Sequence, residues 1–233
     1  PAAPGHIRAF DVRTGARKWI FHTIPHPGEP GHETWPVEGW KTLGGANAWG
    51  GLTLDVQRGI VFCGTGSPSY DHWGGNRIGQ NLYANCVLAL DAATGKRRWH
   101  FQTVHHDLWD YDLPCPPTLV TLERNGRRVD AVAQPSKMGH LFVFDRETGE
   151  PIFPIEEVPV PKSEVPGEQS WPTQPFPPKA LRYAQQRLTE DEATDLSPQA
   201  NAEARARLKK MRTGDIFIPP GFTPSVEIGR AHV

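Results

Sequence analysis

Short runs of alternating apolar and polar residues recur along the chain, and three of them lead into the same tight-turn motif. The motif Asp-x-x-Thr-Gly occupies residues 11–15, 91–95 and 145–149. In such a turn Asp accepts backbone amides, and Gly adopts the positive φ that closes a hairpin. Alternation with a period of two predicts strands with one buried face. The pattern therefore predicts an all-β protein built from repeated hairpins.

An aromatic residue follows each of these turns at the same distance: Trp19, Trp99 and Phe153. Repeated hairpins with an aromatic at one position are typical of a β-propeller, so we expect Trp19 and Trp99 to pack between neighbouring blades. The turn aspartates lie 80 residues apart (91 − 11) and then 54 residues apart (145 − 91). The longer gap predicts an insertion between the first two hairpins.

Strands at regular intervals complete two predicted blades. The first blade combines strands within residues 48–55, 60–63 and 85–104, with a loop at 64–82 between its halves. The second blade combines residues 118–123, 129–134, 141–145 and 151–155. Residues 22–47 and the proline-rich stretch 154–178 are predicted to be long loops.

One segment has the composition of a helix. Residues 188–212 are rich in Glu, Ala, Arg, Lys and Leu, and Thr189 to Glu192 forms a capping-box pattern. We predict a helical insertion of two short helices broken by Pro198, the second ending at Gly214. Residues 216–220 then begin another predicted strand.

Composition restricts the partners of the chain. The net charge of −1 over 233 residues does not favour nucleic acid or an anionic membrane surface. The sequence contains no run of about 18 apolar residues, so it predicts no membrane-spanning helix within these residues. The three cysteines form neither a CxxC nor a zinc pattern.

The two ends of the sequence predict a fragment. The chain starts at Pro1 in a strand-like pattern without an initiator Met. Residues 227–233 read like the translation of a sequencing adapter, so we assign the domain to residues 1–226 and treat 227–233 as an artefact.

The densest chemistry lies in residues 105–112, His-His-Asp-Leu-Trp-Asp-Tyr-Asp. A predicted strand precedes this stretch, and prolines at 114, 116 and 117 follow it, so it is predicted to be a loop at the end of a strand. A carboxylate held among aromatic rings can lose enough water to act as a general base. A solvated acidic turn is the structural alternative.

These motifs together resemble the quinoprotein dehydrogenases, eight-bladed β-propellers that use pyrroloquinoline quinone (PQQ). The hairpins resemble their tryptophan-docking motif, and residues 105–112 resemble their active-site loop. Residues 134–143, 173–176 and 214–220 resemble segments of the glucose dehydrogenase branch. The resemblance runs from Gly5 to about Val226 and implies part of such a propeller: roughly two full blades, partial blades and a helical insertion.

The resemblance implies roles for single residues. Asp110 corresponds to the catalytic aspartate, and Lys137, 27 residues later (137 − 110), corresponds to the cation that binds the quinone carbonyls. Trp49 corresponds to the tryptophan that stacks on the cofactor. An alcohol loses a hydroxyl proton and a hydride when it is oxidised, and Asp110 can take the proton. His106 is a further candidate for the cofactor-binding set, where it can orient Asp110 or the substrate.

The metal position departs from the family pattern. Ser67 lies 18 residues after Trp49 (67 − 49), where alcohol dehydrogenases of the family have a metal-binding Asn. A serine hydroxyl is a weaker ligand for a hard cation such as Ca²⁺ than a carboxamide oxygen. Asp112 corresponds to an extra ligand of lanthanide-dependent relatives, but the glucose branch also has an acid there, so we infer no lanthanide.

The leading hypothesis is thus a PQQ- and Ca²⁺-dependent oxidoreductase that acts on a sugar, polyol or alcohol. The resemblance implies a quinone or cytochrome c as electron acceptor and a periplasmic or cell-envelope location. A non-catalytic β-propeller scaffold or binding protein is the alternative hypothesis. We also expect the fragment alone to be inactive and poorly stable, because an unclosed propeller exposes sheet edges.

Overall fold

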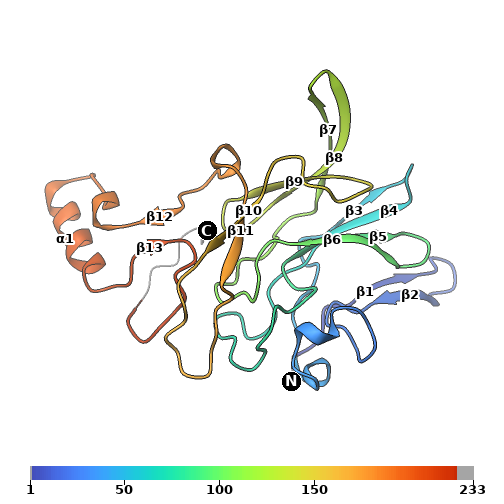
Figure 1. Ribbon diagram of the computed structural model, residues 1–233, viewed down its shortest axis with the longest axis horizontal. Helices are drawn as coiled ribbons and strands as arrows, with labels where there is room; N and C mark the ends of the chain where they lie inside the picture. Colours follow the sequence, from blue (N-terminus) through green and yellow to red (C-terminus); the bar gives the residue numbers. More distant parts are fainter. Residues whose placement is uncertain (1, 225–233) are drawn as a thin grey trace.

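The computed structural model describes residues 2–224, so the adapter-like segment 227–233 lies outside the described residues. The strands form small antiparallel sheets that follow one another along the chain (Figure 1). They are β1 (Ile7–Phe10) with β2 (Arg17–Phe21); β3 (Leu52–Asp55), β4 (Ile60–Gly64), β5 (Cys86–Asp91) and β6 (Arg97–Gln102); β7 (Thr118–Arg124), β8 (Arg127–Pro135) and β9 (Leu141–Asp145); β10 (Glu156–Pro159) with β11 (Thr173–Phe176); and β12 (Arg187–Leu188) with β13 (Gly214–Asp215).

The first predicted blade is confirmed as a four-stranded meander. Its register pairs Leu52 with Cys63, Ile60 with Asp91, and Cys86 with Gln102. Strand β5 is central and almost wholly buried, which explains its run of apolar residues. Apart from Gly64, the last residue of β4, the segments predicted as loops at 22–47 and 64–82 contain no strand, only bridges, turns and the short 3₁₀ helices η1 (His32–Thr34) and η2 (Gly39–Lys41).

The repeated tryptophans dock one hairpin on the next, as predicted. The Trp19 indole N–H donates to the carbonyl of Ala92 at 3.0 Å, and the Trp99 indole N–H donates to the carbonyl of Arg146 at 2.9 Å. Each ring also lies against the glycine of the turn on which it docks, Gly95 or Gly149. The turn motif and the tryptophan therefore act together across the boundary between successive sheets.

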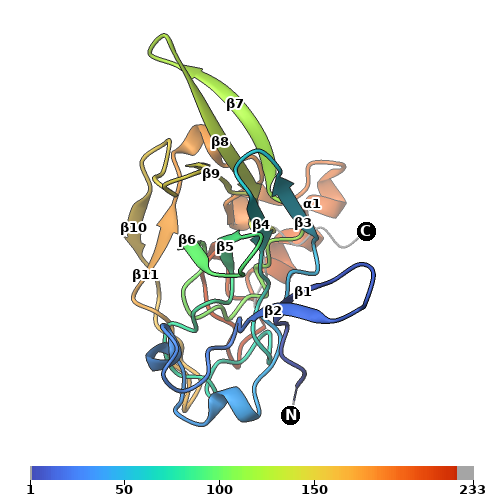
Figure 2. The ribbon, with the colours of Figure 1, turned by 90° about the vertical axis from the view of Figure 1, so that its right-hand side faces the viewer.

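The second predicted blade lacks a regular fourth strand. Strands β7, β8 and β9 form a three-stranded sheet, and the β7–β8 hairpin extends away from the rest of the chain (Figures 1 and 2). Residues 151–155 contribute only a bridge between Phe144 and Pro151 and one hydrogen bond from Ile152 to Val143. Proline at 151 has no amide to donate, and Pro154 removes a second donor, so a continuous ladder does not form.

The proline-rich stretch 154–178 is predicted to be a loop, and the prediction is wrong for β10 and β11 although residues 160–172 contain no strand. Strands β10 and β11 pair within it, from Glu156 opposite Phe176 to Pro159 opposite Thr173. Prolines are tolerated in this two-stranded sheet because both strands are edges, where an amide can be missing without breaking an inner ladder.

The helical insertion exists, but its boundaries differ from the prediction. Pro198 begins helix α1 (Pro198–Leu208) rather than breaking a helix, because a first-turn residue needs no amide donor. The Ser197 side chain caps α1 by accepting from the Ala200 amide. The first predicted helix is only the 3₁₀ turn η4 (Glu190–Glu192), with its capping box. Gly214 lies in β13, not at a helix end.

The predicted strand at 216–220 is instead a buried turn. Ile216 and Phe217 are 3% and 1% exposed and belong to the main hydrophobic cluster of the described residues. That cluster also contains Trp109 and Tyr111 from the loop that follows β6. No helix among the described residues is long and apolar enough to cross a membrane.

Tryptophan docking predicts a selective effect of an added methyl group. Gly149 has a φ of +77°, and a Cβ there would lie 2.6 Å from the Trp99 ring, whereas Gly59, with a φ of +63°, has open space at that position. Gly59→Ala should cost about 1–2 kcal/mol of unfolding free energy through backbone strain alone. Gly149→Ala should cost roughly 1–3 kcal/mol more, because the ring must move. Urea unfolding of both variants checks this, and equal losses would contradict the docking role.

Candidate active site

The loop at residues 105–112 starts three residues after β6 ends and is buried along its whole length. Asp107, Asp110 and Asp112 are 0%, 8% and 7% exposed. This burial excludes the solvated acidic turn. The three carboxylates must instead be satisfied by partners inside the protein.

Asp107 holds the loop together. Its Oδ1 accepts the Trp109 amide at 2.8 Å, and its Oδ2 accepts the Tyr111 amide at 2.8 Å. The side chains of Asn85 (2.8 Å) and Ser67 also donate to Oδ2. Burial raises the pKa of Asp107, while these hydrogen bonds act in the opposite direction. The carboxylate therefore serves as an internal anchor that shapes the turn.

Segments distant in sequence fix the two ends of the loop. The Gln174 side chain of β11 accepts the His105 amide at 2.8 Å and donates to the His105 carbonyl at 2.7 Å. The Trp109 indole N–H donates to the carbonyl of Ile218 at 2.8 Å, and the Tyr111 hydroxyl donates to the carbonyl of Ile216 at 2.6 Å. The motifs at 173–176 and 214–220 thus meet at this loop.

Asp110, Asp112 and Lys137 form a compact charged group. The Lys137 ammonium lies 2.8 Å from Asp110 Oδ2 and 3.0 Å from Asp112 Oδ2, and the Lys137 amide donates to the Asp112 carbonyl at 3.0 Å. Asp110 has a φ of +59°, a left-handed conformation that Asp adopts more readily than most residues. The turn around the anchor carboxylate therefore directs Asp110 toward Lys137.

The local environment shifts the pKa values of Asp112 and Lys137. Burial raises the pKa of Asp112 to about 6, and the neighbouring Asp110 charge adds to this, against hydrogen bonds from the Ser67 amide and Lys137. Burial acts to lower the pKa of Lys137, but the hydrogen bonds to both carboxylates outweigh it and raise the pKa. Lys137 is thus a stable cation between two acids.

Trp49 lies beside this group and exposes an aromatic surface. Its side chain is 53% exposed, and a Cβ on Gly66 would meet both Trp49 Nε1 (3.0 Å) and Asp112 Oδ1 (2.5 Å). Ser67 reaches the same place through its backbone, since its amide donates to Asp112 Oδ1 at 2.7 Å. Its hydroxyl donates to Asp107 instead. The structure therefore brings Trp49, Ser67, Asp110 and Lys137 together.

His106 lies apart from that group. It is buried, and its Nδ1 bonds to the Gly79 carbonyl at 2.7 Å and to Asn81 Oδ1 at 3.0 Å. Burial, with a contribution from the nearby Arg77 charge, lowers the pKa of His106 to about 4. Its polar contacts within the described part of the chain are therefore with the 79–81 segment and not with Asp110 or Lys137.

The donor set suits a planar anionic quinone and a hard cation. Trp49 offers a flat apolar face, and Lys137 is a cationic hydrogen-bond donor that forms ion pairs with two acids. Carboxylate oxygens of Asp110 and Asp112 are the ligand type that Ca²⁺ prefers. The Ser67 hydroxyl is the weakest member of the set because Asp107 occupies it.

Sequence reasoning did not assign the buried residues that support the site. Asp107 belongs to the acidic cluster seen in the sequence, but nothing in the sequence indicates which of the three aspartates of that cluster is fully buried. Asn85 and Gly66 also carry no motif signal, although Asn85 donates to the anchor and Gly66 leaves room for Trp49 and Asp112.

Comparison with known families gives one dominant match. Residues 1–231 match the PQQ family model described as glucose/ethanol/alcohol dehydrogenase, β-propeller domain. The chain is 38% identical to the quinate/shikimate dehydrogenase (quinone) of Acinetobacter baylyi over 95% of its length. It is also 38% identical to the quinoprotein glucose dehydrogenase of Escherichia coli over 93% of its length. The chain spans 27% of each of these relatives.

Solved structures give the same fold. The quinohemoprotein alcohol dehydrogenase from Comamonas testosteroni matches with a TM-score of 0.59 and 30% identity, over 79% of this chain and 29% of that one. A europium-containing methanol dehydrogenase matches with a TM-score of 0.59 and 26% identity, over 74% of this chain and 33% of that one. The sheets described here therefore correspond to part of a β-propeller.

Removing the anchor carboxylate should disrupt the loop. Asp107→Ala leaves several buried donors without an acceptor, and each orphaned donor costs about 1–3 kcal/mol. We expect a loss of at least about 3 kcal/mol in the free energy of unfolding, measured by urea titration. Asp191→Ala, whose side chain is 90% exposed, is the control and should be nearly neutral. Similar losses in both variants would contradict the anchor role.

His106 should contribute to acid sensitivity. The unfolded chain protonates this histidine near pH 6.5, but the folded chain does so only near pH 4, so stability falls as the pH drops through that window. The contribution is on the order of 3 kcal/mol. His106→Gln removes it, so the stability gap between wild type and variant should narrow from pH 7 to pH 4 in urea titrations. A gap that stays constant with pH would show that His106 does not have this lowered pKa.

Proposed function

Because this chain belongs to the PQQ-dependent glucose/ethanol/alcohol dehydrogenase β-propeller family, we propose that the protein carrying it oxidises a sugar, polyol or alcohol with PQQ as cofactor. The single observation that carries this proposal is the pairing of Lys137 with Asp110 at 2.8 Å beside the exposed ring of Trp49. A scaffold protein needs none of these three features at one place.

Asp110 is the general base in this proposal. Oxidation of an alcohol releases a hydroxyl proton, and the Asp110 carboxylate is the acceptor for that proton. The buried turn holds the carboxylate in one position, so little reorganisation is needed when the substrate arrives. Asp112 stays behind it, held by the Ser67 amide.

Lys137 and Trp49 hold the cofactor. Bound PQQ supplies a two-electron acceptor, and Ca²⁺ supplies a Lewis acid next to it. Lys137 would donate a hydrogen bond to the quinone, and Trp49 would offer its ring as an apolar surface for the planar cofactor. Asp112 would offer an oxygen ligand to the metal, with Ser67 as a weak second candidate, so that Asp110 stays available as the base.

The names of the relatives support the finer assignments. A glucose dehydrogenase and a quinate/shikimate dehydrogenase are among them, which favours a sugar or cyclic polyol as the substrate. The label "(quinone)" on the second enzyme favours a quinone as electron acceptor, and the quinohemoprotein relatives favour a haem or cytochrome c. We place the protein in the periplasm or cell envelope on the basis of the family resemblance.

Substitution of the base tests the mechanism. In the intact protein that carries this chain, reconstituted with PQQ and Ca²⁺, Asp110→Asn should lower kcat by roughly 10²–10⁴-fold while PQQ binding is retained. Lys137→Ala, made separately, removes one hydrogen-bond donor. It should lower kcat by roughly 10²–10³-fold and weaken PQQ binding. Dye reduction with a panel of sugars, polyols and alcohols measures turnover, and PQQ absorbance measures binding.

Asp191→Asn is the matched control, because it removes a carboxylate from the exposed insertion. It should leave both readouts unchanged. Full activity of Asp110→Asn would exclude Asp110 as the base. Failure of the wild-type protein to bind PQQ, with no turnover of any substrate, would overturn the dehydrogenase proposal in favour of a scaffold propeller.

A further inference from the structure

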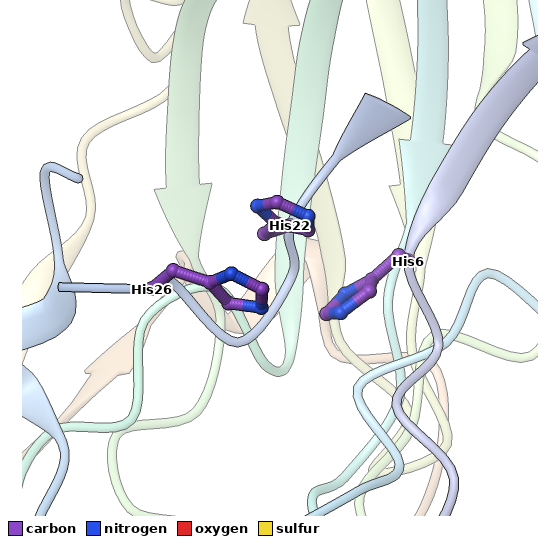
Figure 3. A group of neighbouring side chains, drawn as sticks. All are labelled: His6, His22 and His26. Carbon is purple, nitrogen blue, oxygen red and sulfur yellow. The ribbon is translucent and has the colours of Figure 1, made fainter. Parts of the chain in front are cut away.

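Three histidines converge at the open end of the β1–β2 hairpin (Figure 3). Ile7 and Phe21 are the last paired residues of this hairpin, so His6 and His22 are the next residues outward on the two strands. Their rings lie in edge contact at 4.6 Å. His26 then returns to stack on His22, with ring centroids 3.8 Å apart and an angle of 9° between the planes.

A turn held by Glu29 brings His26 back to the hairpin. The Glu29 carboxylate accepts the His26 amide at 2.7 Å, and the Glu29 amide donates to the His26 carbonyl at 3.0 Å. The same carboxylate bonds to His22 Nδ1 at 2.8 Å. Glu29 therefore fixes the backbone beside one histidine and the ring of another.

The bond to Glu29 leaves the outer nitrogen of His22 available. A carboxylate accepts from Nδ1–H, so Nε2 of the neutral ring keeps its lone pair. This carboxylate–histidine pairing commonly orients metal-binding imidazoles. His26 lies next to this ring, with the two centroids 3.8 Å apart, so both imidazoles are close enough to reach one ion once His26 turns.

One potential ligand atom from each histidine lies within 4.8 Å of the others. Tetrahedral coordination with metal–nitrogen distances of about 2.0–2.1 Å needs nitrogens about 3.4 Å apart and an ion close to the plane of each ring. The His26 ring must therefore rotate out of its parallel stack on His22 before both can bind one ion. His6 must also give up the 3.2 Å hydrogen bond that its Nδ1 accepts from the Thr23 amide. Both His6 and His26 must therefore rearrange when an ion binds, whereas Glu29 already holds His22 in place.

The cluster is reachable from solvent. All three histidines are only partly buried. His22 and Glu29 line an open cavity of about 280 Å³, and His6 lines another of about 310 Å³.

We propose that His6, His22 and His26 bind a divalent transition-metal ion of the Zn²⁺ type, at a site that shares no residue with the Asp110–Lys137 group. Imidazole nitrogens favour such ions, whereas the carboxylates of the other site favour Ca²⁺. The nearby Glu29 carboxylate offsets part of the charge of the ion. The bound ion ties residues 22–26, the start of the long loop, to the end of the first hairpin.

Binding of Zn²⁺ and Co²⁺ to the intact protein tests this site. Calorimetry with Zn²⁺ is run in excess Ca²⁺, so that the oxygen-ligand site does not contribute. We expect one equivalent of Zn²⁺ to bind and Co²⁺ to give the strong visible absorption of a tetrahedral site. His22→Asn should weaken binding by at least 10–100-fold, Glu29→Gln by roughly 10–100-fold, and His6→Asn by less than His22→Asn.

The exposed His72 provides a matched control, and His72→Asn should bind Zn²⁺ as the wild type does. Each variant is first checked for an unchanged thermal midpoint without metal, and Zn²⁺ should raise the midpoint only where the site is intact. Glu29→Gln keeps all three ligands and so remains informative if a histidine variant fails to fold. Zn²⁺ affinity that is unchanged in His22→Asn and Glu29→Gln, or lost equally in His72→Asn, would overturn the proposal.

Discussion

Asp107 loses all contact with water in the folded chain, and the loop that carries Asp110 folds around its carboxylate. A buried carboxylate is costly unless several donors satisfy it, so its partners are restricted to one arrangement. Two of those donors are amides of the loop itself, and the others come from Asn85 and Ser67 on neighbouring segments. The position of Asp110, the proposed base, thus depends on a second acid that is fully buried.

Tryptophan docking sets the larger frame in which this loop can form. Trp19 and Trp99 each bond to the turn of the following hairpin, so each sheet fixes the position of the next. That order brings Gln174 and the 216–218 turn onto the loop from more than sixty residues away. The geometry of the site therefore depends on the packing between sheets. Weakening the contacts of the docked turns should also make the loop at residues 105–112 less ordered.

The described chain contains two clusters whose donor chemistry differs. Around Lys137 the potential metal ligands are carboxylate oxygens, and the Lys137 ammonium already forms ion pairs with them. At the β1–β2 hairpin the donors are imidazole nitrogens, and Glu29 supplies a compensating negative charge nearby. Hard oxygen ligands and borderline nitrogen ligands select different ions, so the two sites need not compete for one metal.

The sequence by itself determined the all-β repeat and the docking tryptophans, because turn motifs and alternating residues are local signals. The grouping of Asp110 with Lys137 was expected only from the resemblance to the quinoprotein dehydrogenases. The sequence did not determine the β10–β11 pairing or the start of α1. Proline destabilises inner positions of a helix or sheet but is accepted at an edge strand or in the first turn of a helix, and only the structural context distinguishes these positions. Only the tertiary structure decided which way each side chain of the site turns: Asp107 inward, Ser67 toward it, and His106 toward the 79–81 segment. Those directions follow from hydrogen bonds between segments far apart in the chain, which no local pattern encodes.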